Sequence, residues 1–397
     1  MDLNVLAIED IWSMNFKNLN INAIQLMPIM EFQGNESWGY TTNFHMALDK
    51  FYGTSNKFKE FIDLCHQNNI AVILDIALDH AAEKNPLVRL WMTDADGNGT
   101  GTPNSQNPYF NENPTHTNSI GSDFNHQQTY TQNYVQRVLE YWTEEFKVDG
   151  FRFDNSKGFT QNCPNNETCT NTLQQDRIDV LKQYADHVWN LNPDQYVIFD
   201  GLGNTAEEKE LADYRYSEGK GAIIMKNLTD SYAQLARGYA SNASIADMDH
   251  EAHNFLGKRL LGYSEGYDDE RLMYECLTTG NTAIPDHNVQ NLDIALSRMS
   301  AIAAASIAIP GPRIIRQFSD LGIEDSIYTC SDGSYNDDSD SDDYDCMQET
   351  KPQPQWANNW LSDPIRSQVY NDWARMNTLK INEPVFEGDY SITTNTL

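Results

Sequence analysis

Polar side chains that could do chemistry stand at or just after the ends of four apolar runs in this sequence. They are Asp75, Asp79, His80, Arg152, Asp154, Asp200, Glu265, Tyr267, Asp268 and Asp269. A single Asp after a strand is often only a helix cap. In a parallel β-barrel, however, the loops after the carboxyl ends of the strands build the active site. The set as a whole is therefore predicted to converge on one small volume.

Carboxylates gathered in this way could cleave a glycosidic bond. One ionised carboxylate attacks the anomeric carbon while a carboxylic acid protonates the leaving oxygen. Retaining enzymes hold this pair about 5 to 5.5 Å apart. A third carboxylate can favour the positively charged transition state. An arginine beside the nucleophile is expected to keep that carboxylate ionised.

Seven short apolar runs are predicted to be the buried parallel strands that position these residues. They are residues 21–26, 70–76, 148–153, 196–199, 221–225, 259–264 and a run near 307–315. Apolar residues recur at offsets of three and four between Phe58 and Cys65, and between Val135 and Phe146, which predicts helices between the strands. The alternation indicates a parallel sheet with helices packed outside it, either a barrel or a doubly wound sheet.

Of these two, we predict an α/β fold of the (β/α)8 TIM-barrel type, with a catalytic barrel over residues 1–380. Seven strands rather than eight are recognisable, and residues 1–20 resemble a helix, so the first strand is either missing or disguised. Residues 81–127 are predicted to be a long insertion after the third strand. Residues 381–397 resemble the beginning of a C-terminal β segment, and residues 324–357 form a long acidic loop.

Composition excludes several classes of partner. The chain has 397 residues, 40% of them hydrophobic, which is enough for a large core. With 27 basic and 58 acidic residues the formal charge is −31, which repels nucleic acid and anionic membranes. No apolar stretch is long enough for a transmembrane helix, and the start lacks the pattern of a signal peptide. We expect a neutral ligand or a cation as partner, with no nucleic acid, no membrane insertion and a monomeric protein.

Two closely spaced cysteine pairs lie in polar loops, Cys163 with Cys169 and Cys330 with Cys346. This spacing favours loop-closing disulfides; zinc is the alternative, although no CxxC or nearby His pair supports it. Cys65 and Cys276 lie in apolar helical patterns and are predicted to be buried thiols. Disulfides favour an oxidising compartment. We therefore expect a secreted, periplasmic or cell-surface protein whose export signal is not visible in this chain.

Several segments resemble the α-amylase superfamily of glycoside hydrolases. DIALDH (75–80) is similar to its first conserved region and GFRFDNSKG (150–158) to its second. VIFDG (197–201) and GYSEGYDDER (262–271) occupy the third and fourth regions. The segments INAIQLMPIMEF, SWGY and DKFYGT resemble the second strand and following loop of bacterial members. The resemblance runs from about residue 16 to about residue 390.

The resemblance implies a role for each matching residue. Asp154 would be the nucleophile, Asp200 would stand at the general-acid position, and Asp268 would be the third carboxylate. The substrate-binding residues that it implies are Tyr40, Asp75, His80, Arg152 and Tyr267. Among these, Tyr40 would form a stacking floor under a sugar ring and His80 would bond sugar hydroxyls.

The chain departs from the family pattern at the site itself. Asp200 stands where the family has a Glu, and its side chain is shorter by about 1.5 Å of reach. Misplacement of a catalytic group by about 1 Å can cost around a hundredfold in rate. Tyr267 replaces the His that precedes the third carboxylate, and Asn155 follows the nucleophile where an apolar residue is common. Asp79 replaces the usual Asn of the first region.

The resemblance also implies a structural calcium ion near Asp79, whose carboxylate suits a hard cation. A second candidate is TDADGNG (93–99), in which Asp94, Asp96 and Asn98 stand at alternate positions as in the first half of a calcium loop. That segment lacks the distal Glu of an EF-hand, and an ordinary Asp-Gly turn is the alternative.

The family likeness implies a retaining glycoside hydrolase that cleaves α-1,4-glucosidic bonds in starch-like glucans. The alternative, suggested by Asp200 and Tyr267, is a catalytically impaired homologue that binds α-glucan. A transglycosylase or isomerase on the same barrel is a third reading, since fold alone does not settle the reaction.

Overall fold

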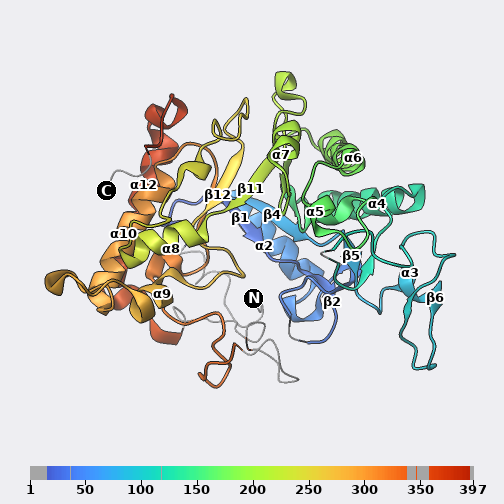
Figure 1. Cartoon of the computed structure of the whole chain (residues 1–397), viewed down its shortest axis with the longest axis horizontal. Coiled ribbons are helices and arrows are strands. Elements are labelled where there is room, and N and C mark those ends of the chain that lie inside the picture. The colour runs from blue at the N-terminus through green and yellow to red at the C-terminus, as the bar shows by residue number, and fades with distance from the viewer. Residues whose placement is uncertain (1–15, 36, 118, 338–345, 347–356, 394–397) are drawn as a thin grey trace. The chain divides into compact units, whose positions relative to one another are not determined.

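The computed structural model describes residues 16–35, 37–117, 119–337, 346 and 357–393 (Figure 1). The chain forms two compact units. The first is built from Asn22–Ile224, and the second from Met225 onward together with a short segment that ends at Ile21. The boundary between the two units falls between Ile224 and Met225, within the strand Ile223–Asn227.

A parallel sheet lies at the centre of the first unit. Its strands in spatial order are β1 (Ala23–Leu26), β4 (Ala71–Ile76), β9 (Gly150–Phe153), β10 (Tyr196–Phe199) and β11 (Ile223–Asn227), the last of which begins in this unit. Phe153 of β9 is level with Ile76 of β4 and with Phe199 of β10. The residues that follow these three strands therefore leave the sheet at the same edge.

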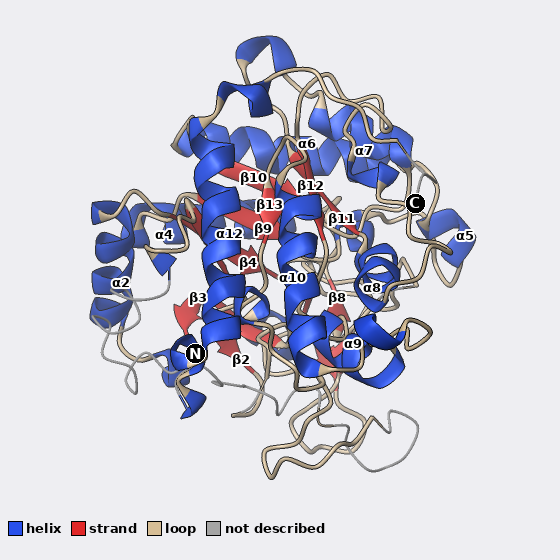
Figure 2. Ribbon diagram, turned by 90° about the vertical axis from the view of Figure 1, so that its left-hand side faces the viewer, coloured by secondary structure: helices blue, strands red, loops and turns tan. Residues whose placement is uncertain are grey.

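Helices of the same unit flank these strands (Figure 2). The longer ones are α2 (Ser55–Gln67), α4 (Thr129–Phe146), α6 (Gln175–Leu191) and α7 (Thr205–Ala212), and the short ones are η2 (Lys50–Tyr52), η3 (Ser156–Phe159), α5 (Glu167–Thr170) and η4 (Tyr216–Glu218). The face of α2 from Phe58 to Cys65 and the face of α4 from Val135 to Phe146 are buried, as their spacing predicts. Thr54 and Asn204 cap the amino ends of α2 and α7 with their side-chain oxygens.

Two connections carry their own small sheets. A hairpin of β2 (Met30–Phe32) and β3 (Thr42–Leu48) precedes α2. The predicted insertion 81–127 falls on a connection after β4 that contains β5 (His80–Ala81), α3 (Pro86–Arg89), β6 (Met92–Thr93), β7 (Thr102–Pro103) and β8 (Ser122–Asp123). In it β5 pairs with β8 and β6 with β7, around a small core of Ala81, Val88, Phe110 and Phe124. The connection belongs to the first compact unit and is not separated from it.

The second unit contains a short parallel pair of strands and a helical layer. The strands are β12 (Leu260–Tyr263) and β13 (Arg313–Ile314). The helices are α8 (Thr229–Arg237), η5 (Ala246–Met248), α9 (Leu272–Thr279), η6 (Pro285–His287), α10 (Leu292–Ile307), η7 (Ser319–Leu321), η8 (Trp360–Ser362), α12 (Pro364–Asn382) and η9 (Pro384–Glu387). Apolar residues of α10 and α12, among them Met299 and Trp373, belong to one buried cluster.

All seven predicted strands are present. The helix predicted in residues 1–20 falls mostly outside the described residues, as does the acidic run 338–345. The β segment predicted from residue 381 is wrong for the part that is described: α12 continues to Asn382, and Pro384–Glu387 forms a 3-10 turn. Pro384 ends the helix because it cannot donate a backbone hydrogen bond. In the described residues no helix is both long and apolar enough to cross a membrane.

The cysteine predictions are confirmed. Disulfides join Cys163 to Cys169 and Cys330 to Cys346, so neither pair is left to bind zinc. Cys65 and Cys276 are free and buried.

Candidate active site

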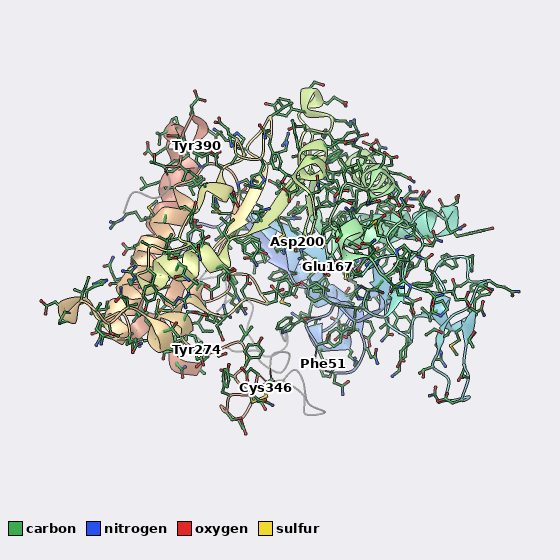
Figure 3. All side chains as sticks on the ribbon, viewed as in Figure 1. Phe51, Glu167, Asp200, Tyr274, Cys346 and Tyr390 are labelled. Atoms are coloured by element: carbon green, nitrogen blue, oxygen red, sulfur yellow. A yellow bond between two sulfur atoms is a disulfide. The ribbon has the colours of Figure 1, made fainter. Side chains whose placement is uncertain are left out.

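Arg152 joins the acidic residues of the first unit. It lies on β9 and its side chain is 1% exposed. Its Nη1 donates to both oxygens of Asp75 at 2.7 Å and to Oδ1 of Asp154 at 2.6 Å. Its Nη2 donates to Asp200, which is labelled in Figure 3. One guanidinium thus binds carboxylates from three neighbouring strands, and for these residues the predicted convergence is confirmed.

Backbone contacts hold the loops of Asp154 and Asp200 near each other. The N–H of Asp154 donates to the carbonyl of Ile76 at 3.1 Å, and the N–H of Ser156 donates to the carbonyl of Asp200 at 2.8 Å. Asn155 between them has a φ of 43°, in the left-handed region that Asn tolerates better than most residues. The chain therefore turns sharply after Asp154, which leaves its side chain at the edge of the sheet.

The cluster has more acidic than basic groups: three carboxyl groups contact the single guanidinium of Arg152. Burial raises the pKa of Asp154; Arg152 lowers it, and the charges of Asp75, Asp79 and Asp200 raise it again, to about 7. Burial also raises the pKa of Asp75. Arg152 lowers the pKa of Asp154, as expected of an adjacent arginine, but its one guanidinium is shared among three carboxyl groups.

Tyr40 lies beside this cluster. Its hydroxyl donates to Oδ2 of Asp75 at 2.7 Å, and Nη1 of Arg152 donates to that hydroxyl at 3.3 Å. The preceding Gly39 has a φ of 98°, and a Cβ there would stand 2.1 Å from the carbonyl oxygen of Pro28, so only glycine fits. Tyr40 is therefore held next to the carboxylates by its hydroxyl and by the tight turn before it. Stacking on a sugar ring stays a prediction.

His80 and Asp79 form a buried pair, and His80 links this pair to the backbone of Tyr40. The Nδ1 of His80 contacts Oδ1 of Asp79 at 2.8 Å, and its Nε2 contacts the carbonyl of Tyr40 at 2.8 Å. Burial lowers the pKa of His80, but Asp79 raises it more, to about 9. Both ring nitrogens can then donate, and the residue is only 2% exposed. To bond a sugar hydroxyl, Nε2 would have to leave the Tyr40 carbonyl, so that role stays a prediction.

A second buried pair, missed by the sequence analysis, lies against Asp79. The Nε2 of His116 contacts Oδ1 of Asp123 at 3.2 Å, and Oδ2 of Asp123 accepts from the backbone N–H of Thr115 at 3.0 Å. A Cβ on Gly158 would stand 2.7 Å from Cβ of Asp79 and 3.1 Å from Cε1 of His116. The sequence around His116 is polar and has the composition of an ordinary loop, so it does not predict that this histidine is buried.

The calcium candidates are engaged by other donors. Oδ2 of Asp79 accepts from the amide of Asn155 at 2.7 Å, and its other oxygen is bound to His80. Asp94 accepts from the N–H groups of Gly97 and Gly99 at 2.7 and 2.9 Å. Asp96 and Asn98 likewise accept from donors of the same loop, as in an Asp-Gly turn. Within the described residues, no three His, Cys, Asp or Glu side chains are grouped to hold a metal. The arrangement does not itself indicate a bound cation.

Asp268 and Tyr267 belong to the second unit, in the loop after β12. The neighbouring Asp269 fixes this loop by accepting from the N–H of Gly266 at 2.9 Å and from the hydroxyl of Thr229 at 2.7 Å. Glu265 accepts from the hydroxyl of Ser319 at 2.8 Å. The assignment of Asp268 as third carboxylate and of Tyr267 as a substrate-binding residue stays a prediction.

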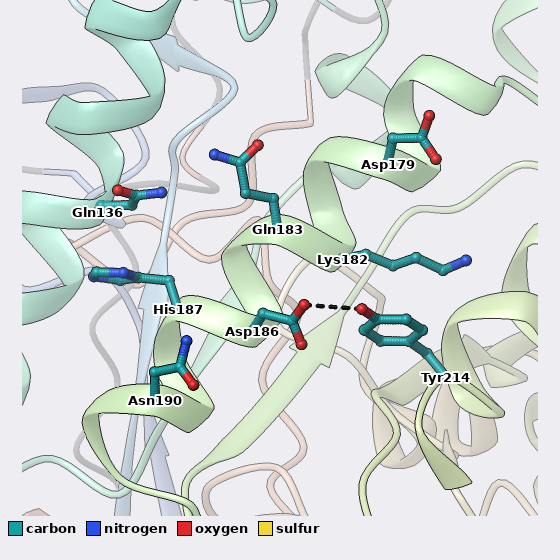
Figure 4. Close-up of a pocket in the computed structure, with 8 residues that line it drawn as sticks. All are labelled: Gln136, Asp179, Lys182, Gln183, Asp186, His187, Asn190 and Tyr214. Carbon is teal, nitrogen blue, oxygen red and sulfur yellow. Dashed lines mark hydrogen bonds between the residues drawn. The ribbon is translucent and has the colours of Figure 1, made fainter.

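A polar hollow lies elsewhere on the first unit (Figure 4). Its lining residues are Gln136, Asp179, Lys182, Gln183, Asp186, His187, Asn190 and Tyr214. Tyr214 donates to Oδ2 of Asp186 at 2.8 Å, and its ring contacts Trp189 and the ammonium of Lys182. The lining comes from α4, α6 and the segment after α7, not from the ends of the strands, so this hollow is not the candidate active site.

Residues 15–261, more than half of the chain, match the family model of the α-amylase catalytic domain. The chain is 30% identical over 172 residues to malto-oligosyltrehalose trehalohydrolase of Saccharolobus solfataricus, covering 42% of this chain and 26% of that protein. It is 33% identical over 138 residues to the 1,4-α-glucan branching enzyme of Halothermothrix orenii, covering 35% and 20%. The aligned part is thus about a quarter or less of each relative.

Solved structures show the fold. The cyclic α-maltosyl-(1→6)-maltose hydrolase of Arthrobacter globiformis has a TM-score of 0.64 at 16% identity, covering 98% of this chain and 76% of that one. A pullulanase from Anoxybacillus sp. LM18-11, complexed with maltotetraose, has a TM-score of 0.63 at 18% identity, covering 93% and 52%. These neighbours are TIM-barrel enzymes, which confirms the predicted fold class.

Proposed function

Because the chain belongs to the family of α-amylase catalytic domains, we propose that it hydrolyses α-1,4-glucosidic bonds of starch-like glucans with retention of configuration. The observation that carries this proposal is the cluster in which Arg152 holds Asp75, Asp154 and Asp200 together. It brings two carboxyl groups to one place at the ends of adjacent strands, as glycosidic cleavage requires.

The reaction has two steps. In the first, an oxygen of Asp154 bonds to the anomeric carbon, the bond from that carbon to the glycosidic oxygen breaks, and Asp200 gives its proton to the leaving oxygen. In the second, water bonds to the anomeric carbon, gives a proton to Asp200, and releases Asp154 as a carboxylate. Each step inverts the anomeric carbon, so the configuration is retained overall, and one water is consumed.

The alternative function is glucan binding without efficient cleavage. One observation favours it: Asp200 accepts a hydrogen bond from Nη2 of Arg152, so its carboxyl group is engaged by the guanidinium and would have to leave it to reach a leaving oxygen. Asp200 is also shorter than Glu by about 1.5 Å of reach.

The proposed function is tested with purified protein and soluble starch, by measuring both reducing-end release and binding to the polymer. Release of products that are first formed as α-anomers supports the proposal. Binding without release supports the alternative. A protein that neither binds nor cleaves the glucan contradicts both.

We expect activity to fall on the acidic side of neutrality. The nucleophile must be ionised, and burial with its neighbouring carboxylates raises the pKa of Asp154 to about 7. The active, deprotonated form is then fully present only above about pH 7 and is lost as the pH falls through that value. The measurement is the pH profile of kcat/KM on maltodextrin, with the melting temperature followed at each pH. An acidic limb near pH 4, the ordinary range of Asp, would contradict the assigned environment.

We also propose a structural calcium ion, bound at Asp79 or in the loop of Asp94, Asp96 and Asn98. This proposal rests on the residue types of these two sites. The ion would have to displace donors that now occupy these oxygens, and no catalytic step above uses it. A ligand that binds the folded state raises the melting temperature. We expect added Ca²⁺ to raise it relative to a chelator, and Asp94→Asn or Asp79→Asn to remove the difference at the site concerned. Equal melting temperatures in the unmodified protein would exclude the ion.

We also propose an oxidising compartment for the protein: secreted, periplasmic or cell-surface. The two disulfides support it, since such bonds are rare in reducing compartments.

A further inference from the structure

Arg177 is a fully buried cation outside the cluster described above. It lies in the first turn of α6 and, like Glu207 of α7, is 0% exposed. Its Nε donates to Oε1 of Glu207 at 3.0 Å and its Nη2 donates to Oε2 at 2.7 Å. This is the two-pronged geometry in which arginine binds a carboxylate most strongly.

The remaining N–H groups of Arg177 reach three backbone carbonyls. Nη1 donates to Lys157 and to Thr170 at 3.1 Å each, and Nη2 donates to Thr172 at 3.0 Å. All five donors of the guanidinium are therefore used, each with its own acceptor contact. For all five hydrogen bonds to form, the separate segments that supply these acceptors must be held in fixed positions at the same time.

Those segments are the ones that carry the reacting carboxylates. Lys157 lies three residues after Asp154, and Glu207 lies seven residues after Asp200. Thr170 and Thr172 follow directly on the loop that the Cys163–Cys169 disulfide closes.

The loop after Asp200 is also packed against the segment that Arg177 binds. A Cβ on Gly203 would stand 2.7 Å from Cα of Asn171, so the two backbones are in contact. The N–H of Gln174 donates to Oε1 of Glu207 at 2.9 Å, which adds a second tie between them. Movement of the Asp200 loop relative to the Asp154 loop therefore has to break contacts of the Arg177–Glu207 pair.

Stability does not explain this pair well. A buried ion pair often contributes nothing net compared with apolar side chains of similar volume. A cation in the first turn of a helix is also disfavoured by the helix dipole. The pair instead fixes the positions of the loops. The guanidinium of Arg177 can make its two bonds to Glu207 and its bonds to the three carbonyls in only one arrangement of these loops.

We propose that Arg177 and Glu207 are positioning residues that fix Asp200 at its working distance from Asp154. This inference rests on the proposed function, since it assigns the pair to that same reaction. Its specific content is that loss of the pair impairs the steps that need both carboxyl groups and spares the step that needs Asp154 alone.

α-Maltosyl fluoride separates these steps. Fluoride leaves without a proton from Asp200, so the first turnover requires only attack by Asp154. Later turnovers require Asp200 to take a proton from water. In Arg177→Lys, which keeps the charge and loses the fork, we expect steady-state turnover to fall by about 10- to 100-fold. The rate of fluoride release in the first turnover should stay unchanged.

Two further variants make the test robust. Arg177→Met with Glu207→Leu removes both charges together, which avoids an unpaired buried ion, and should show the same split. Lys182→Met is the matched control: Lys182 pairs with Glu210 at 2.6 Å between the same two helices but contacts none of the carbonyls that Arg177 binds. It should leave both rates unchanged.

The outcomes are distinguishable. Equal loss of both rates in the Arg177 variants, or loss of neither, overturns the positioning role. An unmodified protein that releases only the first fluoride also overturns it, because Asp200 then fails although the pair is intact. An unmodified protein that releases none contradicts the proposed function, and this inference falls with it.

Discussion

Replacing Asp154 with Asn is expected to reduce reducing-end release from starch by about 10⁴-fold or more, the scale seen when a nucleophile is removed from a covalent mechanism. The amide cannot form the covalent bond to the anomeric carbon. The change removes one negative charge next to Arg152 and keeps the shape of the side chain, so the fold should persist. The measurement is product release per hour at saturating starch, with the melting temperature of each protein recorded.

The control for this variant is Asp194→Asn, an exposed carboxylate in the loop before β10 of the same unit. It changes the net charge equally and should leave turnover unchanged. Normal turnover in Asp154→Asn would refute Asp154 as the nucleophile. A parallel loss in the Asp194 variant would show that net charge, and not the nucleophile, is being measured.

Replacing Asp200 with Glu is expected to raise the rate, by up to about a hundredfold if misplacement of the proton donor is the main defect. The added methylene extends the carboxyl group by about 1.5 Å. That allows it to reach beyond Nη2 of Arg152, its partner in this structure, toward a leaving oxygen. The rate on maltodextrin is compared with that of Asp200→Asn, which has no proton to give and should fall below the unmodified protein.

No gain in Asp200→Glu would mean that the site has re-formed around the shorter acid or has lost its function elsewhere. Tyr267 is a second departure at an implied site residue, and it belongs to the second unit. Combining Asp200→Glu with Tyr267→His then tests whether both departures must be reversed together.

Periodicity and local composition explain what the sequence predicted well. The seven strands are short apolar runs bounded by polar residues, and the buried faces of α2 and α4 follow their spacing of three and four. The cysteine pairs are close in sequence, so their pairing is a local matter. Asp75, Asp154 and Asp200 could be grouped because parallel strands end at one edge.

Properties that depend on distant neighbours could not be predicted in this way. Arg177 and Glu207 are 30 residues apart and look like ordinary helix charges, which are usually exposed to solvent. The pKa of Asp154 depends on its burial and on four charged neighbours; the sequence predicted that these neighbours gather, but not how deeply Asp154 is buried among them. His80 resembled a sugar ligand, yet both its nitrogens are engaged by the protein.

The two free cysteines bear on how the protein survives heating. Burial raises the pKa of Cys65 and of Cys276 to about 12, so in the folded state neither forms the thiolate that attacks disulfides. Unfolding returns both thiols to their ordinary acidity in a chain that also holds two disulfides. Exchange then yields mismatched bridges that persist on cooling. Heat inactivation is therefore expected to be irreversible at alkaline pH, and refolding to succeed best in mild acid.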